Sequence, residues 1–304
     1  MQIVVKQVSG LGNQMFQYAA GRYYARRYGA HMRMAVDHAR NAVSHGHPRP
    51  FLLSNFEITA PVKELSRIDR FVLTQRQWLR PASAAFRAAL GIYVSAEEVE
   101  QRYTFMPDLP LQRNVKTLYL VGYWQAHRRV DDIAEELRSE FAFKKPAQGK
   151  NLQVLDQIKQ SKNPVSLHVR RGDYTLAAEG NIALPIDYYS QAISTFRKRL
   201  DDPTFFVFSD DIAYTREHLP RGIRAIFVDH NDASSSHEDL RLMSSCRHHI
   251  IANSTFSWWG AWLNPRPDKM VFAPKYWLLK QDSYFPDLLP PSWMLADTPD
   301  TISV

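Results

Sequence analysis

Five short apolar runs in the second half of the chain alternate with helix-like stretches, and this alternation constrains the possible folds more than any other feature. The runs with the character of β-strands are 165–169, 204–208, 223–228, 248–252 and 269–273. The stretches between them with the character of helices are 185–200, 211–219, 237–247 and 255–264. Strands and helices that alternate in this way predict a parallel sheet covered by helices.

Polar residues gather where these expected strands end. The segments that follow the first four strands are Arg170-Arg171, Ser209-Asp210-Asp211, Asp229-His230 and Asn253-Ser254-Thr255. Because crossovers between parallel strands are right-handed, the carboxyl ends of the strands share one edge of the sheet, where open α/β sheets bind ligands. The alternative is that the Ser, Asp and Asn residues only cap the helices that follow.

The first half of the chain has a less regular pattern. The elements expected there are strands at 2–8, 31–36 and 117–121, a helix after Gly10 and a helix at 130–141. Residues 40–115 contain many prolines and aromatic residues without a clear period and stay unassigned. A polar segment at 144–151 separates the halves. For a chain of 304 residues we therefore predict two domains, residues 1–148 and 149–304.

Composition is that of a globular protein, with 45% hydrophobic and 23% charged residues. No apolar run approaches the roughly 20 residues that cross a bilayer, and residues 1–6 are expected to form a strand rather than a signal peptide. The single cysteine, Cys246, excludes an internal disulfide and argues against a cysteine-based zinc site. These features predict a cytoplasmic protein.

The formal net charge of +7 and the pI near 9.4 favour anionic partners. The positive charge is dispersed in short clusters such as Arg128-Arg129 and Lys144-Lys145. Without a basic tail or an RNA-binding aromatic signature, a nucleotide-sized anion is a better prediction than nucleic acid. The same charge is compatible with peripheral contact with anionic lipid at the inner face of a membrane.

The segment His168-Val169-Arg170-Arg171-Gly172-Asp173 carries the strongest chemical signal at the expected sheet edge. Arginine stays charged at physiological pH, and its planar guanidinium binds phosphate oxygens in pairs. Two arginines at a strand-to-loop turn therefore suggest a diphosphate site. The alternative is a pair of surface arginines after a strand, with His168 packed in the core.

The segment Gly10-Leu11-Gly12-Asn13-Gln14 is open to three interpretations. It matches the first two glycines of a dinucleotide-binding fingerprint, with Asp37 as the ribose-binding acid, although Met15 stands in place of the third glycine. It also suits a tight turn whose backbone N–H groups and Asn13 amide face a cleft between domains. The third interpretation is a turn that only lets a strand and a helix pack closely.

Asp210 and Asp211 are candidates for a metal site. Two carboxylates after a strand suit Mg²⁺ or Mn²⁺ bound to a diphosphate. Either residue also suits the N-cap of the helix that follows. We favour the cap, because Arg170 and Arg171 already supply positive charge, and no metal site is predicted.

Two groups of ring side chains are interpreted as structural. His248 and His249 lack the spacing of a zinc site, since neighbouring side chains in a strand point to opposite faces. Trp258, Trp259 and Trp262 follow helical spacing, which predicts a place in the core or in a wall between domains.

Taken in order, several segments resemble the bacterial α-1,2-fucosyltransferases of glycosyltransferase family 11. The matching segments are Gly10-Leu11-Gly12-Asn13-Gln14-Met15-Phe16-Gln17-Tyr18-Ala19, Gly122-Tyr123-Trp124-Gln125, His168-Val169-Arg170-Arg171-Gly172-Asp173-Tyr174, Asp239-Leu240-x-Leu242-Met243-Ser244-x-Cys246 and Asn253-Ser254-Thr255-Phe256-Ser257-Trp258-Trp259-Gly260. Each motif is modest alone, but their order over residues 10–260 is specific. Residues 40–115 match loosely, and acceptor choice is expected to lie there.

The resemblance implies an α/β fold of the GT-B kind, with two Rossmann-type domains and a donor cleft between them. It implies that residues 1–148 form the acceptor-side domain and that residues 149–304 bind GDP-β-L-fucose. No metal and no cofactor beyond this donor are expected. L-Fucose would pass to the 2-hydroxyl of a terminal β-galactoside, free or lipid-linked, with inversion at the anomeric carbon. The enzyme would be bacterial and would serve O-antigen or oligosaccharide synthesis.

The resemblance also implies roles for individual residues. Arg170 would contact the diphosphate, and Arg171 would support it through an ion pair, with Asp173 as a candidate partner. His168 and Asp239 would contact guanine and ribose, although Asp239 also suits the first turn of a helix.

Further residues are candidate ligands of the phosphate groups. Ser254, Thr255 and Ser257 lie at an expected strand end and helix N-terminus, where hydroxyl and backbone N–H groups donate to phosphate with help from the helix dipole. Gly12 and Asn13 are assigned to nucleotide-sugar binding through the glycine-rich turn.

The general base that takes the proton of the acceptor hydroxyl stays open between Asp173, Asp37 and another acid of the first domain. Two other functions also stay open. One is an NAD(P)-dependent oxidoreductase that uses the Gly10–Gly12 turn, which preferential binding of NAD over GDP would favour. The other is a non-catalytic basic carbohydrate-binding protein, which steep salt dependence without turnover would favour.

Overall fold

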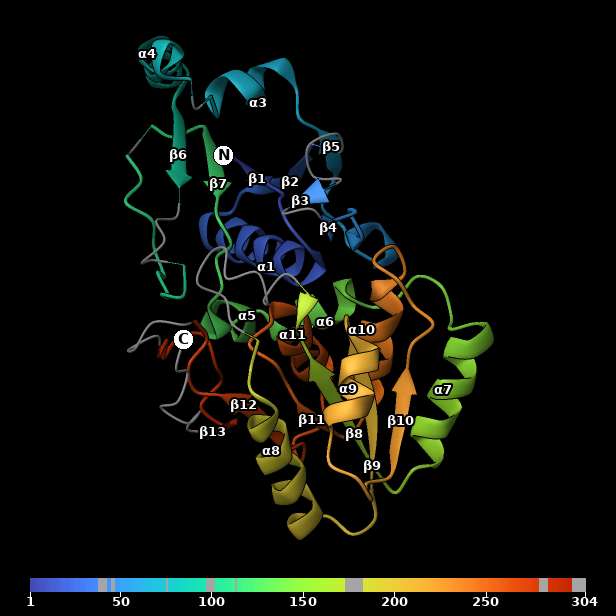
Figure 1. Cartoon of the computed structure of the whole chain (residues 1–304). Helices are drawn as coiled ribbons and strands as arrows, with labels where there is room; N and C mark the ends of the chain where they lie inside the picture. Colours follow the sequence, from blue (N-terminus) through green and yellow to red (C-terminus); the bar gives the residue numbers. More distant parts are fainter. Residues whose placement is uncertain are drawn as a thin grey trace. The chain divides into compact units, whose positions relative to one another are not determined.

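The computed structural model describes residues 1–37, 43–44, 47–74, 76–96, 102–112, 114–172, 183–278 and 284–296. The chain divides into two compact units. Unit 1 contains residues 1–142 and 286–290, and unit 2 contains residues 143–285 and 291–304. Each unit has its own parallel sheet with helices packed on it (Figure 1).

The sheet of unit 1 has five strands in the order β5-β2-β1-β7-β6, and every neighbouring pair is parallel. These strands are β1 (Gln2–Lys6), β2 (His31–Val36), β5 (Val62–Glu64), β6 (Ile92–Ala96) and β7 (Thr117–Val121). The helical elements are α1 (Leu11–Tyr28), η1 (Leu53–Asn55), α3 (Arg67–Val72), η2 (Gln77–Leu79), α4 (Arg80–Leu90), α5 (His127–Asp131) and α6 (Ala134–Glu140). A separate antiparallel pair consists of β3 (Val43–Ser44) and β4 (His47–Pro48).

Alternate residues of β1 face two layers of helices. Val5 lies against α1, where a Cβ atom on Gly21 would come within 2.5 Å of both Val5 and Met32. Helix α1 therefore lies closer to the sheet than a larger residue at position 21 would allow. Val4 packs on the opposite face together with Val72 of α3, and α4 also covers that face. This central strand is buried on both faces, as in other parallel sheets.

The prediction of a single continuous helix at 130–141 is wrong. Helices α5 and α6 replace it, because Ile133 leaves the helical region with φ −128° and ψ 32°. Val130, Ile133 and Leu137, which lie before, at and after the break, are each almost fully buried.

The sheet of unit 2 has six strands in the order β10-β9-β8-β11-β12-β13, and again every neighbouring pair is parallel. These strands are β8 (Asn163–Val169), β9 (Pro203–Ser209), β10 (Ala225–Val228), β11 (His248–Ile250), β12 (Val271–Pro274) and β13 (Met294–Ala296). The helices are α7 (Gly149–Gln160), α8 (Ile186–Arg199), α9 (Ile212–His218), α10 (Ser236–Ser245) and α11 (Thr255–Leu263). The five strands and four helices predicted for this half are therefore confirmed, whereas α7 and β13 were not predicted.

Helices cover both faces of this sheet. Leu167 of β8 belongs to a cluster with Phe196 of α8, and Phe206 of β9 belongs to another with Leu242 of α10. Strand β8 is buried along its whole length. The residues Trp258, Trp259 and Trp262 are buried, which confirms their predicted place in the core. Among the described helices, none combines the length and the apolar character needed to cross a membrane.

Candidate functional site

The strand order of unit 2 points to one place on its sheet. If β8 to β13 are counted from one to six, the spatial order is 3-2-1-4-5-6, which is that of a nucleotide-binding Rossmann sheet. The order reverses between β8 and β11, and ligands of such sheets bind there, outside the carboxyl ends of the strands. Arg170 follows β8 directly, and Ser254 and Thr255 lie between β11 and α11, where that helix begins. Three of the predicted site residues therefore flank the expected nucleotide position.

One carboxylate organises the turn after β8. Oδ2 of Asp210 lies 2.9 Å from Nη1 of Arg170. Its Oδ1 accepts a hydrogen bond of 2.8 Å from the backbone N–H of Arg171. A Cβ atom on Gly172 would lie 2.5 Å from Asp210 Oδ2, so this carboxylate fits against the turn only because residue 172 has no side chain. Asp210 thus holds both the backbone of the turn and the guanidinium of Arg170.

Arg171 is anchored to helix α9. Its guanidinium stacks on the ring of Tyr214, 3.3 Å from the ring centroid, and its Nε lies 3.4 Å from Oδ2 of Asp211. Asp211 also caps α9 by accepting a hydrogen bond from the backbone N–H of Tyr214, which confirms the predicted cap. The ion pair expected for Arg171 is formed with Asp211. Asp173, the candidate partner from the sequence, lies outside the described residues.

His168 is a neutral ring near the end of β8. Its imidazole packs edge-on against Phe256 of α11, with 5.7 Å between the ring centroids. Burial, together with the charge of Arg170, lowers the pKa of His168 far below its ordinary value. Its Nδ1 is buried and makes no hydrogen bond within the described part of the chain. His168 therefore contributes an uncharged wall to this strand end, and the positive charge comes from Arg170.

The N-terminus of α11 is the second positive element at this edge. Ser254 is the N-cap residue and its side chain makes no capping hydrogen bond, while Thr255 opens the helix. Helix N-termini attract anions through their unpaired N–H groups and the helix dipole. Ser257 is 2% exposed and donates a hydrogen bond of 3.3 Å to the carbonyl of Ser254. Because that hydroxyl is used within the helix, Ser254 and Thr255 suit phosphate better than Ser257.

Asp239 lies in a polar network at the start of α10. Its Oδ1 accepts a hydrogen bond of 2.7 Å from Nδ2 of Asn231, which is itself hydrogen-bonded to Asn151 of α7. Burial raises the pKa of Asp239 to about 7, with a smaller contribution from the neighbouring charge of Glu238. A half-buried carboxylate with a raised pKa is a candidate for a functional site.

Unit 1 has a comparable reversal of strand order between β1 and β7. Ser9, after β1, and Trp124, after β7, both adopt left-handed backbone conformations, with φ of 69° and 57°. Asn13 of α1 joins the two segments: it donates to Oγ of Ser9 at 3.0 Å and accepts from Nε2 of Gln125 at 2.7 Å. Strained backbone at two neighbouring strand ends is a feature of ligand sites. The predicted residue Gly12 is buried in the first turn of α1.

Asp37 has a structural partner in unit 1. It is almost fully buried, and its Oδ2 lies 2.7 Å from Nη1 of Arg70. This ion pair fixes α3 against the end of β2. The pairing satisfies the carboxylate within the fold, which weakens its candidacy as a ribose ligand or a general base.

His248 and His249 are also held by structural partners, as predicted. The ring of His249 lies between Oγ of Ser166, at 2.8 Å, and Nδ2 of Asn264, at 2.9 Å. Nδ1 of His248 accepts a hydrogen bond from the backbone N–H of Met270. Over the ranges that the structure describes, no group of three His, Cys, Asp or Glu side chains is placed to hold a metal ion.

From the sequence Asp210 was predicted only as a metal ligand or a helix cap, and Gln125 was given no role of its own. The signal in the sequence was that Arg170 and Asp210 both lie where an apolar run ends. In the structure β8 and β9 pair with Val169 opposite Ser209, so Arg170 and Asp210 are the first residues after the two strands. Gln125 ends the segment Gly122-Tyr123-Trp124-Gln125 that carries the family resemblance, but its partner Asn13 lies far away along the chain.

The chain is similar to known glycosyltransferases over most of its length. The family described as Glycosyl transferase family 11 matches residues 92–286. The O-antigen biosynthesis glycosyltransferase WbnK of Escherichia coli is 32% identical over 285 residues, which cover 88% of this chain and 92% of WbnK. The alpha-1,2-colitosyltransferase of Escherichia coli is 30% identical over 311 residues, which cover 97% of this chain and 99% of that protein.

Among solved structures, a mutant of Arabidopsis thaliana FUT1 in complex with GDP is similar in fold. The TM-score is 0.50 and the sequence identity 12%, with 98% of this chain and 76% of that chain covered. At this identity the likeness concerns the fold alone. The two parallel-sheet units, each with helices on its sheet, are GT-B-like, as predicted.

Proposed function

The chain belongs to glycosyl transferase family 11, and on this premise we propose that it is an inverting fucosyltransferase. L-Fucose leaves GDP-β-L-fucose and becomes bonded to the 2-hydroxyl of a terminal β-galactoside in an α-linkage. Family membership and the α-1,2 linkage in the name of one relative support this reaction. Both findings favour fucosyl transfer over the activity of an oxidoreductase and over a non-catalytic carbohydrate-binding protein.

The observation that carries this proposal is the ion pair of Arg170 and Asp210 at the turn after β8. This turn lies at the edge of the unit 2 sheet where Rossmann-type sheets bind nucleotides. Arg170 binds the diphosphate of the donor, and Asp210 keeps its guanidinium in place through the ion pair of 2.9 Å. A guanidinium has five N–H donors, so it can bind a carboxylate and phosphate oxygens at once. The N-terminus of α11, with Ser254 and Thr255, supplies further N–H and hydroxyl donors. Arg171 supports the turn from its anchor on α9.

The chemistry requires charge stabilisation at the leaving group. The bond between C1 of fucose and the β-phosphate oxygen breaks, and GDP leaves with an additional negative charge. Galactose O2 attacks the opposite face of C1, which inverts the anomeric configuration. Arg170 stabilises the charge that develops on the diphosphate, and an oriented cation of this kind contributes a few kcal/mol. No metal ion is part of this proposal, and EDTA should leave turnover unchanged.

The proton of the galactose hydroxyl needs an acceptor. Asp37, one of the candidates from the sequence, is engaged in its ion pair with Arg70. Asp173 follows Arg170 by three residues and is the first of the remaining candidate acids to test. If Asp173 is the base, Asp173→Asn abolishes fucosyl transfer but leaves GDP binding unchanged.

Asp239 and His168 are assigned to the nucleoside. Guanine presents two neighbouring donors, N1–H and the N2 amino group, and a carboxylate accepts both; adenine has no such pair. The half-buried Asp239, oriented by Asn231, has this chemistry. The neutral ring of His168 suits contact with an uncharged base or ribose.

We assign the acceptor to unit 1, and we keep Gly12 and Asn13, whose turn is joined to Gln125, as candidate ligands of the nucleotide sugar. A cytoplasmic location with contact at the inner face of a membrane completes this proposal, and the net charge of +7 supports it.

The test is incubation with GDP-β-L-fucose and a panel of β-galactosides, with products identified by mass. We expect a fucosylated product with wild-type protein and with Arg197→Lys, a control on the exposed face of α8. A donor carrying colitose is the comparison arm, because one relative is named a colitosyltransferase. Thermal stabilisation by NAD and not by GDP would contradict the proposal.

A further inference from the structure

The most exposed large hydrophobic side chains of the described chain gather in one segment of unit 1. Trp78 of η2 is 73% exposed, Ile68 of α3 is 58% exposed and Leu90 at the end of α4 is 47% exposed. Helix α3 packs on α4 through the rings of Phe71 and Phe86, and η2 leads directly into α4. Single exposed apolar residues are common on protein surfaces, whereas a group of them marks an interaction site.

Helix α4 has an apolar side that is turned to solvent. Together with η2 it presents an outer face of six exposed residues, which are Trp78, Pro81, Ala82, Ala85, Ala88 and Ala89. Trp78, Ala82, Ala85 and Ala89 are spaced by four, three and four residues, so they follow one side of the helix. The outer face therefore carries one large aromatic side chain and no charged or hydrogen-bonding side chain apart from the indole N–H.

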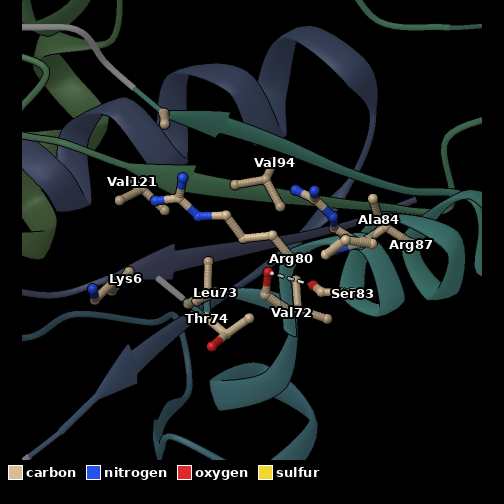
Figure 2. A pocket seen from close by; sticks show the side chains of 12 residues that line it. Lys6, Val72, Leu73, Thr74, Arg80, Ser83, Ala84, Arg87, Val94 and Val121 are labelled. Carbon is tan, nitrogen blue, oxygen red and sulfur yellow. Dashed lines mark hydrogen bonds between the residues drawn. The ribbon is translucent and has the colours of Figure 1, made fainter. Parts of the chain in front are cut away.

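The polar residues of α4 lie on its other side. Arg80, Ser83 and Arg87 line a pocket together with Lys6 at the end of β1, and Figure 2 shows Arg80 extending from α4 over the strands. Oγ of Ser83 donates a hydrogen bond of 3.0 Å to the carbonyl of Phe71, which ties this side of α4 to α3. Surface helices normally have the opposite arrangement, with their polar side in water. The inversion indicates that an apolar partner covers the outer face.

The segment that contains the outer face is positively charged. Residues 66–96 contain five arginines and one acid, Asp69. Asp69 is buried and lies 2.5 Å from the guanidinium of Arg33, so its charge is compensated inside the unit. Arg67 of α3 and Arg76 next to η2 are exposed. An apolar face in a cationic segment is typical of helices that lie in the interface of an anionic membrane.

The same charges argue against a dimer formed through this face. A twofold axis brings the same patch of both copies together, so the arginines of one copy would approach those of the other. An anionic bilayer compensates these charges instead. Tryptophan also prefers the boundary between headgroups and acyl chains, which suits the exposed position of Trp78.

We propose that the outer face of η2 and α4 docks on a bilayer that contains anionic lipids. Trp78 inserts at the level of the headgroups, and Arg76 lies against lipid phosphate groups. The inference rests on the proposed function, which places the enzyme at the inner face of a membrane, and it identifies the surface that makes this contact.

Sedimentation with vesicles of phosphatidylcholine, with and without phosphatidylglycerol, tests the docking surface. Wild-type protein should bind the vesicles that contain phosphatidylglycerol, and high salt should weaken this binding. Trp78→Ala should lower the partition coefficient by about tenfold or more, because a large aromatic side chain loses its membrane contact. Arg76→Gln should lower it by roughly fivefold, the effect of one cation near an anionic surface. Leu152→Ala, which removes an exposed hydrophobic side chain from α7, is the matched control and should bind as wild type does.

Ala85→Glu places a charge in the middle of the outer face without changing the buried side of α4. Glutamate is a good helix former, and an unchanged melting temperature shows that the fold is intact. We expect this variant to lose vesicle binding, because the carboxylate is repelled by anionic lipid and is costly to remove from water. Ser194→Glu, at an exposed position of α8, adds the same charge elsewhere and should keep binding.

Fluorescence tests the contact of Trp78 itself. All seven tryptophans lie in the described ranges, and the six others are buried. Vesicles with brominated acyl chains should therefore quench the emission of Trp78 selectively. Trp78→Phe should still bind these vesicles but lose the quenching. Equal quenching of wild type and Trp78→Phe would overturn the assignment of this face.

The outcomes separate this inference from the proposed function. If wild-type protein binds neither vesicle, or if Trp78→Ala and Ala85→Glu bind as wild type does, the docking surface is overturned and transfer to a soluble galactoside is unaffected. Loss of binding in these variants supports the surface even if no galactoside is turned over, in which case fucosyl transfer is wrong. A dimer in light scattering that Ala85→Glu dissociates would assign the face to a second copy and overturn membrane docking.

Discussion

Arg170 and Asp210 form an ion pair of 2.9 Å between the first residues after two neighbouring parallel strands. The pair is partly exposed, with about a fifth of the Arg170 side chain and a quarter of the Asp210 side chain accessible. A surface pair of this kind adds little to stability. Its importance is in orientation, because it fixes the guanidinium at the sheet edge where we propose that the donor binds.

Arg170→Lys should lose nearly all transferase activity although it keeps the positive charge. Lysine lacks the planar fork that binds two oxygens at once, so we expect kcat/KM to fall by roughly 10²–10³. Initial rates with GDP-fucose measure this, and an unchanged melting temperature shows that the fold is intact. Near-normal turnover by Arg170→Lys contradicts the bidentate contact with the diphosphate.

Asp210→Asn tests whether the partner of Arg170 positions it. The asparagine oxygen can still accept from the backbone N–H of Arg171, but the charge that holds Arg170 is lost. We expect kcat to fall about tenfold and the KM for the acceptor to stay constant. Asp202→Asn, which removes an exposed ion pair with Arg224, is the matched control. Equal kcat values for the two variants would show that Asp210 is dispensable for orientation.

Gly172→Ala should reproduce the Asp210 defect without changing any charge. Its Cβ would lie 2.5 Å from Asp210 Oδ2, so the carboxylate must move away from the turn. We expect kcat to fall by about as much as in Asp210→Asn, and the double variant to be no worse than either single variant. Additive losses in the double variant would mean that Gly172 acts independently of Asp210.

Asp239→Asn should weaken GDP binding but stabilise the protein at alkaline pH. The pKa of Asp239 is raised to about 7 by burial, so the folded protein binds this proton more tightly than the unfolded chain does. The stabilising contribution is full at low pH and is lost as the pH rises from about 4 through 7. The free energy of unfolding of wild type should therefore fall relative to Asp239→Asn between pH 5 and pH 8.

Calorimetry with GDP and IDP tests the role of the same carboxylate in recognition. IDP lacks the N2 amino group, so wild-type protein should prefer GDP, and Asp239→Asn should reduce that preference by about tenfold. An unchanged ratio of the two dissociation constants would remove Asp239 from the guanine site.

Asp211→Ala should act on stability more than on catalysis. The substitution removes the N-cap of α9 and the ion-pair partner of Arg171. Loss of an N-cap costs about 1 kcal/mol. Denaturant unfolding should show this loss, and Asp211→Asn, which retains a capping side chain, should lose less. A loss of turnover by Asp211→Asn as large as that of Arg170→Lys would give Asp211 a direct role.

The fold of unit 2 was predictable because its strands are buried on both faces and its turns are polar. The apolar run at 165–169, followed by Arg170 and Gly172, fixes both the strand and its end. Residues 40–115 had no comparable pattern. They supply the edge strands β5 and β6 and the helices α3 and α4, whose residues are largely exposed on one side. Strand β5 has three residues and helix α3 has six, which are too few to show a clear period in the sequence.

The candidate site was predictable only where it is local in sequence. The Arg170 segment, the cap at Asp211 and the first turn of α10 at Asp239 each carry their own signal. The contacts from Asp210 to Arg170 and from Gln125 to Asn13 depend on which strands become neighbours. The cations Lys6 and Arg80 share a pocket for the same reason, although 73 residues separate them along the chain.

The position and configuration of the new glycosidic bond test the central claim most directly. Wild-type protein is incubated with GDP-β-L-fucose and a terminal β-galactoside, and the purified product is analysed by two-dimensional NMR. We expect one α-linked fucose on O2 of galactose. A β-linkage, attachment at another hydroxyl, or release of free fucose without any disaccharide would contradict the account.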